Sequence, residues 1–252
     1  MWDAALWGLI QGLTEFLPIS SSGHLVLVPA ILDREGPDLA TTAVLHLGTL
    51  AAVLVYFRTE VSGVVRMTPD GRRLLRVVAI GTLPAVVFGL TLRSQLERLN
   101  DTPRAVAIAL FAAGIVLLLA SRLSRGSAIS ADVSDRDAVA IGVGQALAVI
   151  PGVTRSGMTI AVGTARSLSL YEAARFAFLL GIPVIAGTGL LQLVELAGEE
   201  EGIRAETLVG VGVAAVVGYA AIAGLLRVIR KAGLGPFGIY CVVAGAVAFV
   251  LV

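Results

Sequence analysis

The chain has 252 residues, of which 57% are hydrophobic and 15% charged, and its mean hydropathy is +0.91. Soluble domains carry about 25% charged residues, so a water-soluble fold of this composition would lack polar surface, and we expect a membrane protein. A net charge of +1 provides no basic surface for nucleic acid, and the single cysteine, Cys241, cannot form an intramolecular disulfide.

The apolar segments along the chain are of two kinds. A helix needs about 20 apolar residues to cross the core of a bilayer. Region 1–32 is apolar but is broken by proline, glycine and a cluster of hydroxyl residues, and region 138–165 is broken in the same way. Six unbroken segments are long enough to cross: 39–57, 74–92, 104–121, 172–194, 207–226 and 234–251.

Basic residues in the connections predict how these six segments are oriented. Eleven lie in the connections 58–76 and 122–137 and at 227–231, whereas the alternate connections hold five. Because cytoplasmic loops carry the excess of arginine and lysine, we expect the side with eleven to face the cytoplasm and both termini to lie outside. Region 1–32 then enters from outside and region 138–165 from the cytoplasm, as two re-entrant helical hairpins of opposite orientation.

The two broken regions also resemble each other. Residues 11–23 are Gln-Gly-Leu-Thr-Glu-Phe-Leu-Pro-Ile-Ser-Ser-Ser-Gly, and residues 145–157 are Gln-Ala-Leu-Ala-Val-Ile-Pro-Gly-Val-Thr-Arg-Ser-Gly. We therefore expect an all-α polytopic membrane protein, a single domain over 1–252, with six transmembrane helices plus two re-entrant hairpins in an inverted repeat of about 1–122 and 138–252. Broken helices in such repeats meet near the midplane and form a site there.

Few ionisable groups lie within the apolar segments: Glu15, His24, His46 and Arg155. A charge at the bilayer centre costs about 2.5–3.5 kcal/mol, so each of these groups is a functional candidate. Glu15 and Arg155 belong to opposite hairpins, and they form either part of a site or a buried ion pair that holds the hairpins together. His46 is expected to bond a neighbouring helix carbonyl, with a cavity-lining role as the alternative.

Hydroxyl residues and glycines surround the two opposite charges. Ser20, Ser21, Ser22 and Gly23 belong to the first hairpin, and Thr154, Ser156 and Gly157 flank Arg155 in the second. Hydroxyls, backbone N–H groups at the start of a helix and an arginine fork all suit phosphate. Two such turns on matched hairpins indicate a site for a phosphate-bearing ligand.

The segment from Gln11 to His24 resembles the first signature of bacterial undecaprenyl-diphosphate phosphatases of the bacitracin-resistance type. The segment from Pro151 to Thr159 resembles the second, Pro-Gly-x-Ser-Arg-Ser-x-x-Thr, with Thr154 in place of a serine. The resemblance covers nearly the whole chain. It implies an integral membrane enzyme that hydrolyses a polyprenyl diphosphate to the monophosphate and inorganic phosphate, recycling the lipid carrier for cell-wall synthesis.

The resemblance also implies roles for the residues of the two motifs. Arg155 is expected to grip the phosphate, together with the surrounding hydroxyls, glycines and Thr159. Glu15 and Gln11 are one helical turn apart and are expected to hold a divalent cation, Mg²⁺ or Ca²⁺, against the diphosphate. For the nucleophile, either Ser21 attacks after activation by His24, or Glu15 or His24 activates water, or His24 itself takes the phosphoryl group.

Other features are assigned by their surroundings. The expected partners are a lipid diphosphate, reached from the outer side of the plasma membrane, and membrane lipids, with no nucleic acid; the oligomeric state, monomer or homodimer, is open. Glu172 and Arg175 are expected to be interfacial charges, and the glutamates at 199–201 a solvated loop. A transporter of polyprenyl phosphate is the alternative function, since inverted repeats also build carriers.

Overall fold

The computed structural model describes residues 2–123, 127–129, 133–196 and 205–252, so the glutamates at 199–201 lie outside the described residues. Within the described ranges the secondary structure is helical apart from an isolated bridge between Ala128 and Leu168, which confirms the expected all-α class. The helices are α1 Trp2–Phe16, α2 Ser21–Ile31, α3 Leu39–Tyr56, α4 Arg58–Val65, α5 Pro69–Thr91, α6 Arg93–Asn100, α7 Pro103–Leu123, α8 Asp135–Leu147, α9 Arg155–Ala165, α10 Leu170–Leu196, α11 Ala205–Ala232 and α12 Gly235–Leu251.

All six segments predicted to cross the membrane are helices: α3, α5, α7, α10, α11 and α12. Four of the described helices, α5, α7, α10 and α11, are long and apolar enough to cross a bilayer. The other two are shorter, because α3 bends by 85° into α4 after Tyr56 and α12 has 17 residues. The chain is therefore a multi-pass membrane protein, and the number of spans stays a prediction.

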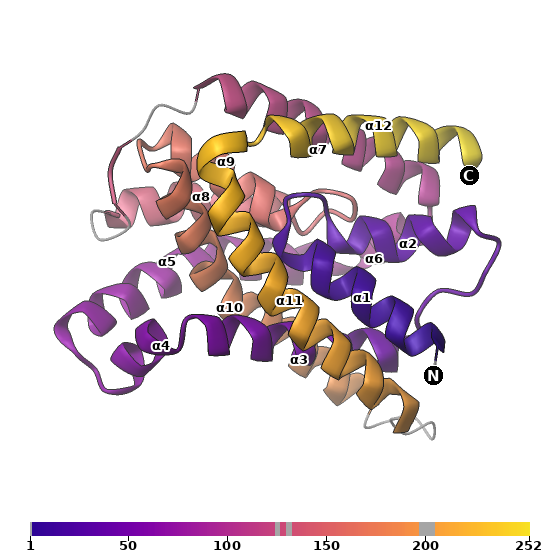
Figure 1. Cartoon of the computed structure of the whole chain (residues 1–252), viewed down its shortest axis with the longest axis horizontal. Coiled ribbons are helices and arrows are strands. Elements are labelled where there is room, and N and C mark those ends of the chain that lie inside the picture. Colours follow the sequence, from indigo (N-terminus) through magenta and orange to yellow (C-terminus); the bar gives the residue numbers. More distant parts are fainter. Residues whose placement is uncertain (1, 124–126, 130–132, 197–204) are drawn as a thin grey trace.

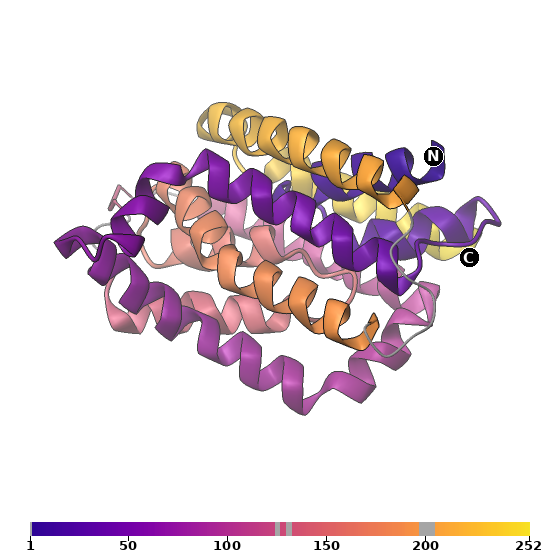
Figure 2. The ribbon, with the colours of Figure 1, turned by 90° about the horizontal axis from the view of Figure 1, so that it is seen from below.

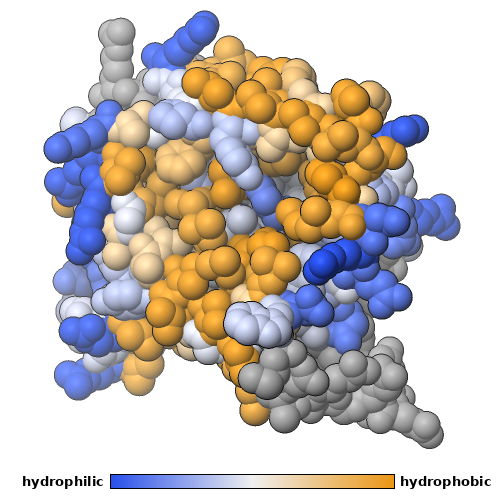
Figure 3. Space-filling view, turned by 45° about the vertical axis from the view of Figure 1, so that its right-hand side comes forward, coloured by the Kyte–Doolittle hydropathy of each residue, from blue (hydrophilic) through white to orange (hydrophobic). Residues whose placement is uncertain are grey.

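The surface has the pattern of a protein that sits in lipid. Figure 3 shows hydrophobic residues across the middle of one face, with hydrophilic residues gathered at two opposite edges. In Figure 1 the two termini lie at the same end of the molecule, and α4 lies at the opposite end. The short helices α4 and α6 were expected as connections between spans, because eight residues that include charged side chains are too few to cross a bilayer.

The two broken regions form helical hairpins, α1 with α2 and α8 with α9. Their helices have 15, 11, 13 and 11 residues. At about 1.5 Å per residue, even the longest spans only about 22 Å, less than the bilayer core of about 30 Å. The turns of the two hairpins touch, since Ser156 Oγ donates to the carbonyl of Leu17 at 3.0 Å.

Each hairpin packs on a long helix from the other half of the chain. Helix α1 lies along α11, and α8 lies along α5. The contacts are made by glycines: a Cβ added to Gly8 would lie 2.3 Å from the carbonyl oxygen of Gly210, and one added to Gly142 would lie 2.3 Å from that of Gly81. Small residues allow such close helix contact in membranes. This reciprocal packing is what an internal repeat would produce, although the repeat itself stays a prediction.

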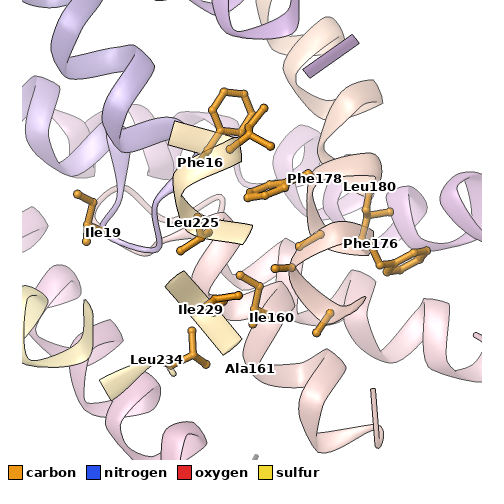
Figure 4. Packing of buried hydrophobic residues seen from close by; sticks show 14 of the residues in the cluster. Phe16, Ile19, Ile160, Ala161, Phe176, Phe178, Leu180, Leu225, Ile229 and Leu234 are labelled. Atoms are coloured by element: carbon orange, nitrogen blue, oxygen red, sulfur yellow. The ribbon is translucent and has the colours of Figure 1, made fainter. Parts of the chain in front are cut away.

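Aromatic packing fixes the end of α1 near the centre of the molecule. The rings of Phe16 and Phe178 meet edge to face, with centroids 5.6 Å apart and planes at 88° (Figure 4). Phe16 follows Glu15 directly, and Phe178 lies one turn before Gly181 on α10. The contact therefore holds the carboxylate of Glu15 beside the middle of α10. Figure 2 shows α10 running between α3 and α5.

Candidate active site

The two hairpin turns are built alike. Ser20 caps α2, its Oγ accepting a hydrogen bond from the N–H of Gly23 at 3.1 Å, and its φ of 70° places it in the left-handed region. Thr154 caps α9 in the same way, accepting from the N–H of Gly157 at 3.2 Å. Hydroxyl residues are favoured at this position because their oxygen satisfies an N–H that the helix leaves free. The hydroxyls of Ser20 and Thr154 therefore define the turns.

Four predicted residues meet between these turns. Arg155 Nη2 donates to Glu15 Oε1 at 2.6 Å, and Ser21 Oγ donates to Glu15 Oε2 at 2.6 Å. The amide of Gln11 donates to the same Oε2 at 3.1 Å. The carboxylate is almost fully buried, with 6% of the Glu15 side chain exposed, whereas 17% of the Arg155 side chain is exposed. The prediction that the two hairpins place Glu15 and Arg155 together is confirmed.

Two polar atoms of this group have no partner within the described part of the chain. They are Arg155 Nη1, a donor, and Gln11 Oε1, an acceptor, and both are buried. Buried polar groups are almost always hydrogen-bonded, so these two atoms mark positions that suit a ligand. A free guanidinium nitrogen suits a phosphate oxygen, and a free amide oxygen beside a carboxylate suits a divalent cation.

Gly181 of α10 makes room for the arginine. A Cβ added to Gly181 would lie 2.2 Å from Arg155 Nη1 and 2.9 Å from Cζ. Gly181 was not among the residues predicted from the sequence. A glycine inside a helix costs about 1 kcal/mol relative to alanine. The position of Gly181 in the interior of α10 is therefore the sequence signal that could have indicated a group packed closely against this helix.

His24 lies in a different environment from the one expected. Its Nδ1 is 2.7 Å from the carbonyl oxygen of Ser20 and its Nε2 is 2.6 Å from the hydroxyl of Tyr240. Since a carbonyl only accepts, Nδ1 carries a proton, and in the neutral ring Nε2 accepts from Tyr240. The two rings are stacked at 5.7 Å. The structure thus pairs Ser21 with Glu15 and not with His24.

Tyr240 was likewise not among the residues predicted from the sequence. It belongs to α12, where it is one polar group in an otherwise apolar helix. The neighbouring Cys241 lies 3.5 Å from the carbonyl of Pro18, so α12 packs against the turn of the first hairpin. A tyrosine within a membrane helix usually finds a partner for its hydroxyl, and that is the signal that could have identified it.

The remaining predicted phosphate ligands have structural partners. Ser22 Oγ accepts from the N–H of Gly152 at 3.5 Å, and Ser156 Oγ bonds Leu17 across the hairpins. Thr159 Oγ1 donates to the carbonyl of Arg155 within its own helix. The two predicted glycines allow close packing: a Cβ on Gly23 would lie 3.4 Å from Gly152 Cα, and one on Gly157 would lie 2.5 Å from Thr154 Cγ2. Phosphate binding by these residues stays a prediction.

Two other predictions concern His46 and the cation. His46 Nδ1 bonds the carbonyl of Thr42 at 2.8 Å, as expected for a helix histidine. Among the residues that the structure describes, no group of three or more His, Cys, Asp and Glu side chains is placed to hold a metal ion. A cation site at Gln11 and Glu15 would therefore contain one carboxylate, and substrate oxygens and water would complete it.

The fold and this centre define a class: a multi-pass membrane protein whose buried charged and hydroxyl groups, drawn from two helical hairpins, suit a phosphate-bearing ligand. A family model described as bacitracin resistance protein BacA matches residues 4–247. The chain belongs to this family.

Curated relatives of the chain carry a common name. It is 41% identical to an undecaprenyl-diphosphatase from Trichlorobacter lovleyi, over 96% of this chain and 93% of that protein. It is 39% identical to the undecaprenyl-diphosphatase of Thermomicrobium roseum, over 100% and 98%. The corresponding protein of Desulforudis audaxviator is 40% identical, over 99% and 97%. The similarity thus covers nearly the whole of this chain and of each of the three relatives.

Proposed function

We propose that the protein is an undecaprenyl-diphosphate phosphatase, which hydrolyses the phosphoanhydride of undecaprenyl diphosphate to the monophosphate and inorganic phosphate. The observation that carries this function is the contact of Glu15 with both Arg155 and Ser21 between the hairpins. The names of the relatives agree with it. A carrier would need the arginine clamp, but it would gain nothing from a serine hydroxyl bonded to a buried carboxylate.

The contacts support Ser21 as nucleophile and Glu15 as its base. Glu15 takes the proton of the Ser21 hydroxyl as Oγ attacks the terminal phosphorus, and the anhydride P–O bond breaks to release undecaprenyl phosphate. Water then attacks the phosphoserine, Ser21 regains its proton and inorganic phosphate leaves. The guanidinium of Arg155 stabilises the charge that develops on the phosphoryl oxygens in both steps. Attack by water alone, with Glu15 as base, is the competing route.

Gln11 and Glu15 fit a divalent cation through the free Oε1 of Gln11 and the carboxylate. When bound, such a cation supplies charge neutralisation for the diphosphate. Because Glu15 also serves Ser21 and Arg155, binding of a cation and of substrate is expected to be mutually dependent.

The same proposal includes the arrangement in the membrane. We place both termini and the opening of the site on the outer side of the plasma membrane, with α4 and the basic connections in the cytoplasm. Figure 1 supports this orientation, because both termini lie at one end of the molecule and α4 lies at the opposite end. The short hairpin helices support re-entrant segments in an inverted repeat. Assembly as a homodimer stays a prediction.

The test is phosphate release from undecaprenyl diphosphate by the detergent-purified protein, with and without a divalent cation, for the wild type, Arg155→Ala and His24→Ala. Detergent removes the second compartment that a carrier needs, so release identifies an enzyme. We expect cation-dependent release that is lost in Arg155→Ala. Rapid quenching with labelled substrate should trap phosphate on Ser21, and labelling that persists in Ser21→Ala would exclude this nucleophile. A folded wild type that binds the lipid without releasing phosphate would favour the carrier.

Tyr240→Phe tests whether the contact with His24 positions that ring for the reaction. Loss of one hydrogen bond of about 0.5–1.5 kcal/mol corresponds to a roughly two- to thirteenfold fall in kcat, and we expect KM to be unchanged. Tyr219→Phe is the matched control, since the Tyr219 ring packs on Tyr56 of α3. In a His24→Ala background, Tyr240→Phe should have no further effect. An additive loss there would show that Tyr240 does not act through His24.

A further inference from the structure

A pocket lies at the end of the molecule where α4 meets α5. It has a volume of about 720 Å³ and is lined by Arg58, Thr59, Glu60, Ser62, Gly63, Arg66, Thr68, Asp70, Gly71, Leu74 and Arg175. None of these residues belongs to either hairpin, so the pocket is separate from the centre around Glu15. A volume of this size accommodates a lipid headgroup or a small ligand.

The lining is basic and rich in hydroxyls. Arg175 forms an ion pair with Glu60, and its guanidinium lies 3.7 Å from the carboxylate of Glu172. The two residues expected to be interfacial charges, Glu172 and Arg175, thus belong to one cluster of charges at the start of α10. Within the part of the chain that the structure describes, the guanidinium groups of Arg58 and Arg66 form no ion pair. Two cationic forks therefore line the pocket without a carboxylate partner, which is the chemistry that binds phosphate.

The pocket is preformed by its backbone. Helix α3 bends by 85° into α4, and α4 packs against α5. The glycines of the two helices touch, since a Cβ added to Gly71 would lie 2.1 Å from the carbonyl oxygen of Gly63. The N–H of Thr68 donates to that same carbonyl at 3.0 Å, and its hydroxyl caps α5. The backbone around the pocket therefore needs little rearrangement when a ligand binds, which favours affinity.

Apolar side chains stand beside the basic ones. Val65 is 76% exposed and Met67 49% exposed, on either side of Arg66. Apolar side chains next to arginines are typical of a segment at the boundary between acyl chains and headgroups. Figure 1 places α4 at the end opposite both termini, which is the end predicted to face the cytoplasm. The cytoplasmic leaflet carries the anionic lipids that attract such residues.

We propose that this pocket binds the phosphate headgroup of an anionic phospholipid from the leaflet on the α4 side. Arg58 and Arg66 contact the phosphate, the hydroxyl of Ser62 adds a hydrogen bond, and Val65 and Met67 lie against the acyl chains. Of the two carboxylates in this lining, Glu60 is paired with Arg175, and Asp70, at the start of α5, disfavours a highly charged ligand such as a diphosphate. A phosphodiester with one negative charge fits better than the substrate of the enzyme.

The experiment uses the full-length protein in detergent and measures its thermal unfolding with added phosphatidylglycerol, phosphatidylcholine or inorganic phosphate. We expect phosphatidylglycerol to raise the Tm of the wild type by several degrees and the other two to have little effect. Native mass spectrometry should detect retained phosphatidylglycerol. In the variant Arg58→Gln/Arg66→Gln we expect at least a fivefold weaker response to this lipid, with phosphate release in lipid-free detergent unchanged.

Arg98→Gln is the matched control, because Arg98 is exposed on α6 and does not line the pocket. It should respond to phosphatidylglycerol like the wild type. An undiminished response in Arg58→Gln/Arg66→Gln would overturn the proposal. An equal effect of inorganic phosphate would show that the pocket binds free anion, and an equal effect of phosphatidylcholine would show that the anionic headgroup is not recognised. Since phosphate release is measured separately, a failure here leaves the enzymatic function untouched.

Discussion

Replacing Glu15 with glutamine is expected to lower the rate of phosphate release by about a thousandfold, the scale of losing a general base. The carboxylate accepts hydrogen bonds from Ser21 and Arg155, both at 2.6 Å. Glutamine keeps the shape of the side chain but cannot take the proton of Ser21. Steady-state phosphate release from undecaprenyl diphosphate in detergent measures the loss. Glu35→Gln, in the exposed connection after α2, is the control and should keep wild-type activity.

A second variant separates catalysis from folding. Glu15→Gln leaves the guanidinium of Arg155 buried without its counter-charge, and breaking a buried pair costs about 3–5 kcal/mol of stability. We expect Glu15→Gln/Arg155→Met to recover much of the Tm while remaining inactive. Recovered activity in this double variant would mean that the pair only holds the hairpins together, which is the alternative that the sequence left open.

Gly181→Ala is expected to reduce phosphate release by about a hundredfold, because small displacements of a positioning group have effects of this size. The added methyl would lie 2.2 Å from Arg155 Nη1. The guanidinium is the flexible end of a long side chain, so it should move while the helices stay in place. We therefore expect the Tm to change little and both kcat and KM to deteriorate, since Arg155 contacts the phosphate in the substrate and in the transition state.

Gly187→Ala is the matched control on the same helix. Apart from Gly187 itself, its chain neighbours and the nearby backbone of its own helix, no atom of the described residues lies within 4 Å of a Cβ built at this position. Alanine is the better helix former by about 0.5–1 kcal/mol, so this variant should be active and at least as stable as the wild type. Wild-type kinetics in Gly181→Ala would show that Arg155 does not need the position it has in the structure.

The elements of the fold were predictable because lipid restricts the choice of structure. Backbone groups in a bilayer must be satisfied within the segment itself, so each of the six long apolar segments became a helix. The interruptions at Pro18 and at Pro151 likewise marked the two hairpin turns. What could not be predicted was the 85° bend after Tyr56 or the packing of α4 on α5 through Gly63 and Gly71, because both are contacts and directions in space that no local pattern of residues marks.

For the site, the sequence by itself determined which ionisable side chains lie within apolar segments, where burying their charge in lipid costs free energy and indicates a function. Glu15 and Arg155 were identified in this way, and the structure brings them together. Only the tertiary structure decided the partners: Ser21 bonds Glu15, His24 bonds Tyr240 from a helix 216 positions further along the chain, and Gly181 makes room for the arginine. The physical reason is that the free energy of burying a charge depends on the residue's own side chain, which the sequence gives. The partner of that side chain depends on how the helices pack against one another, which only the tertiary structure gives.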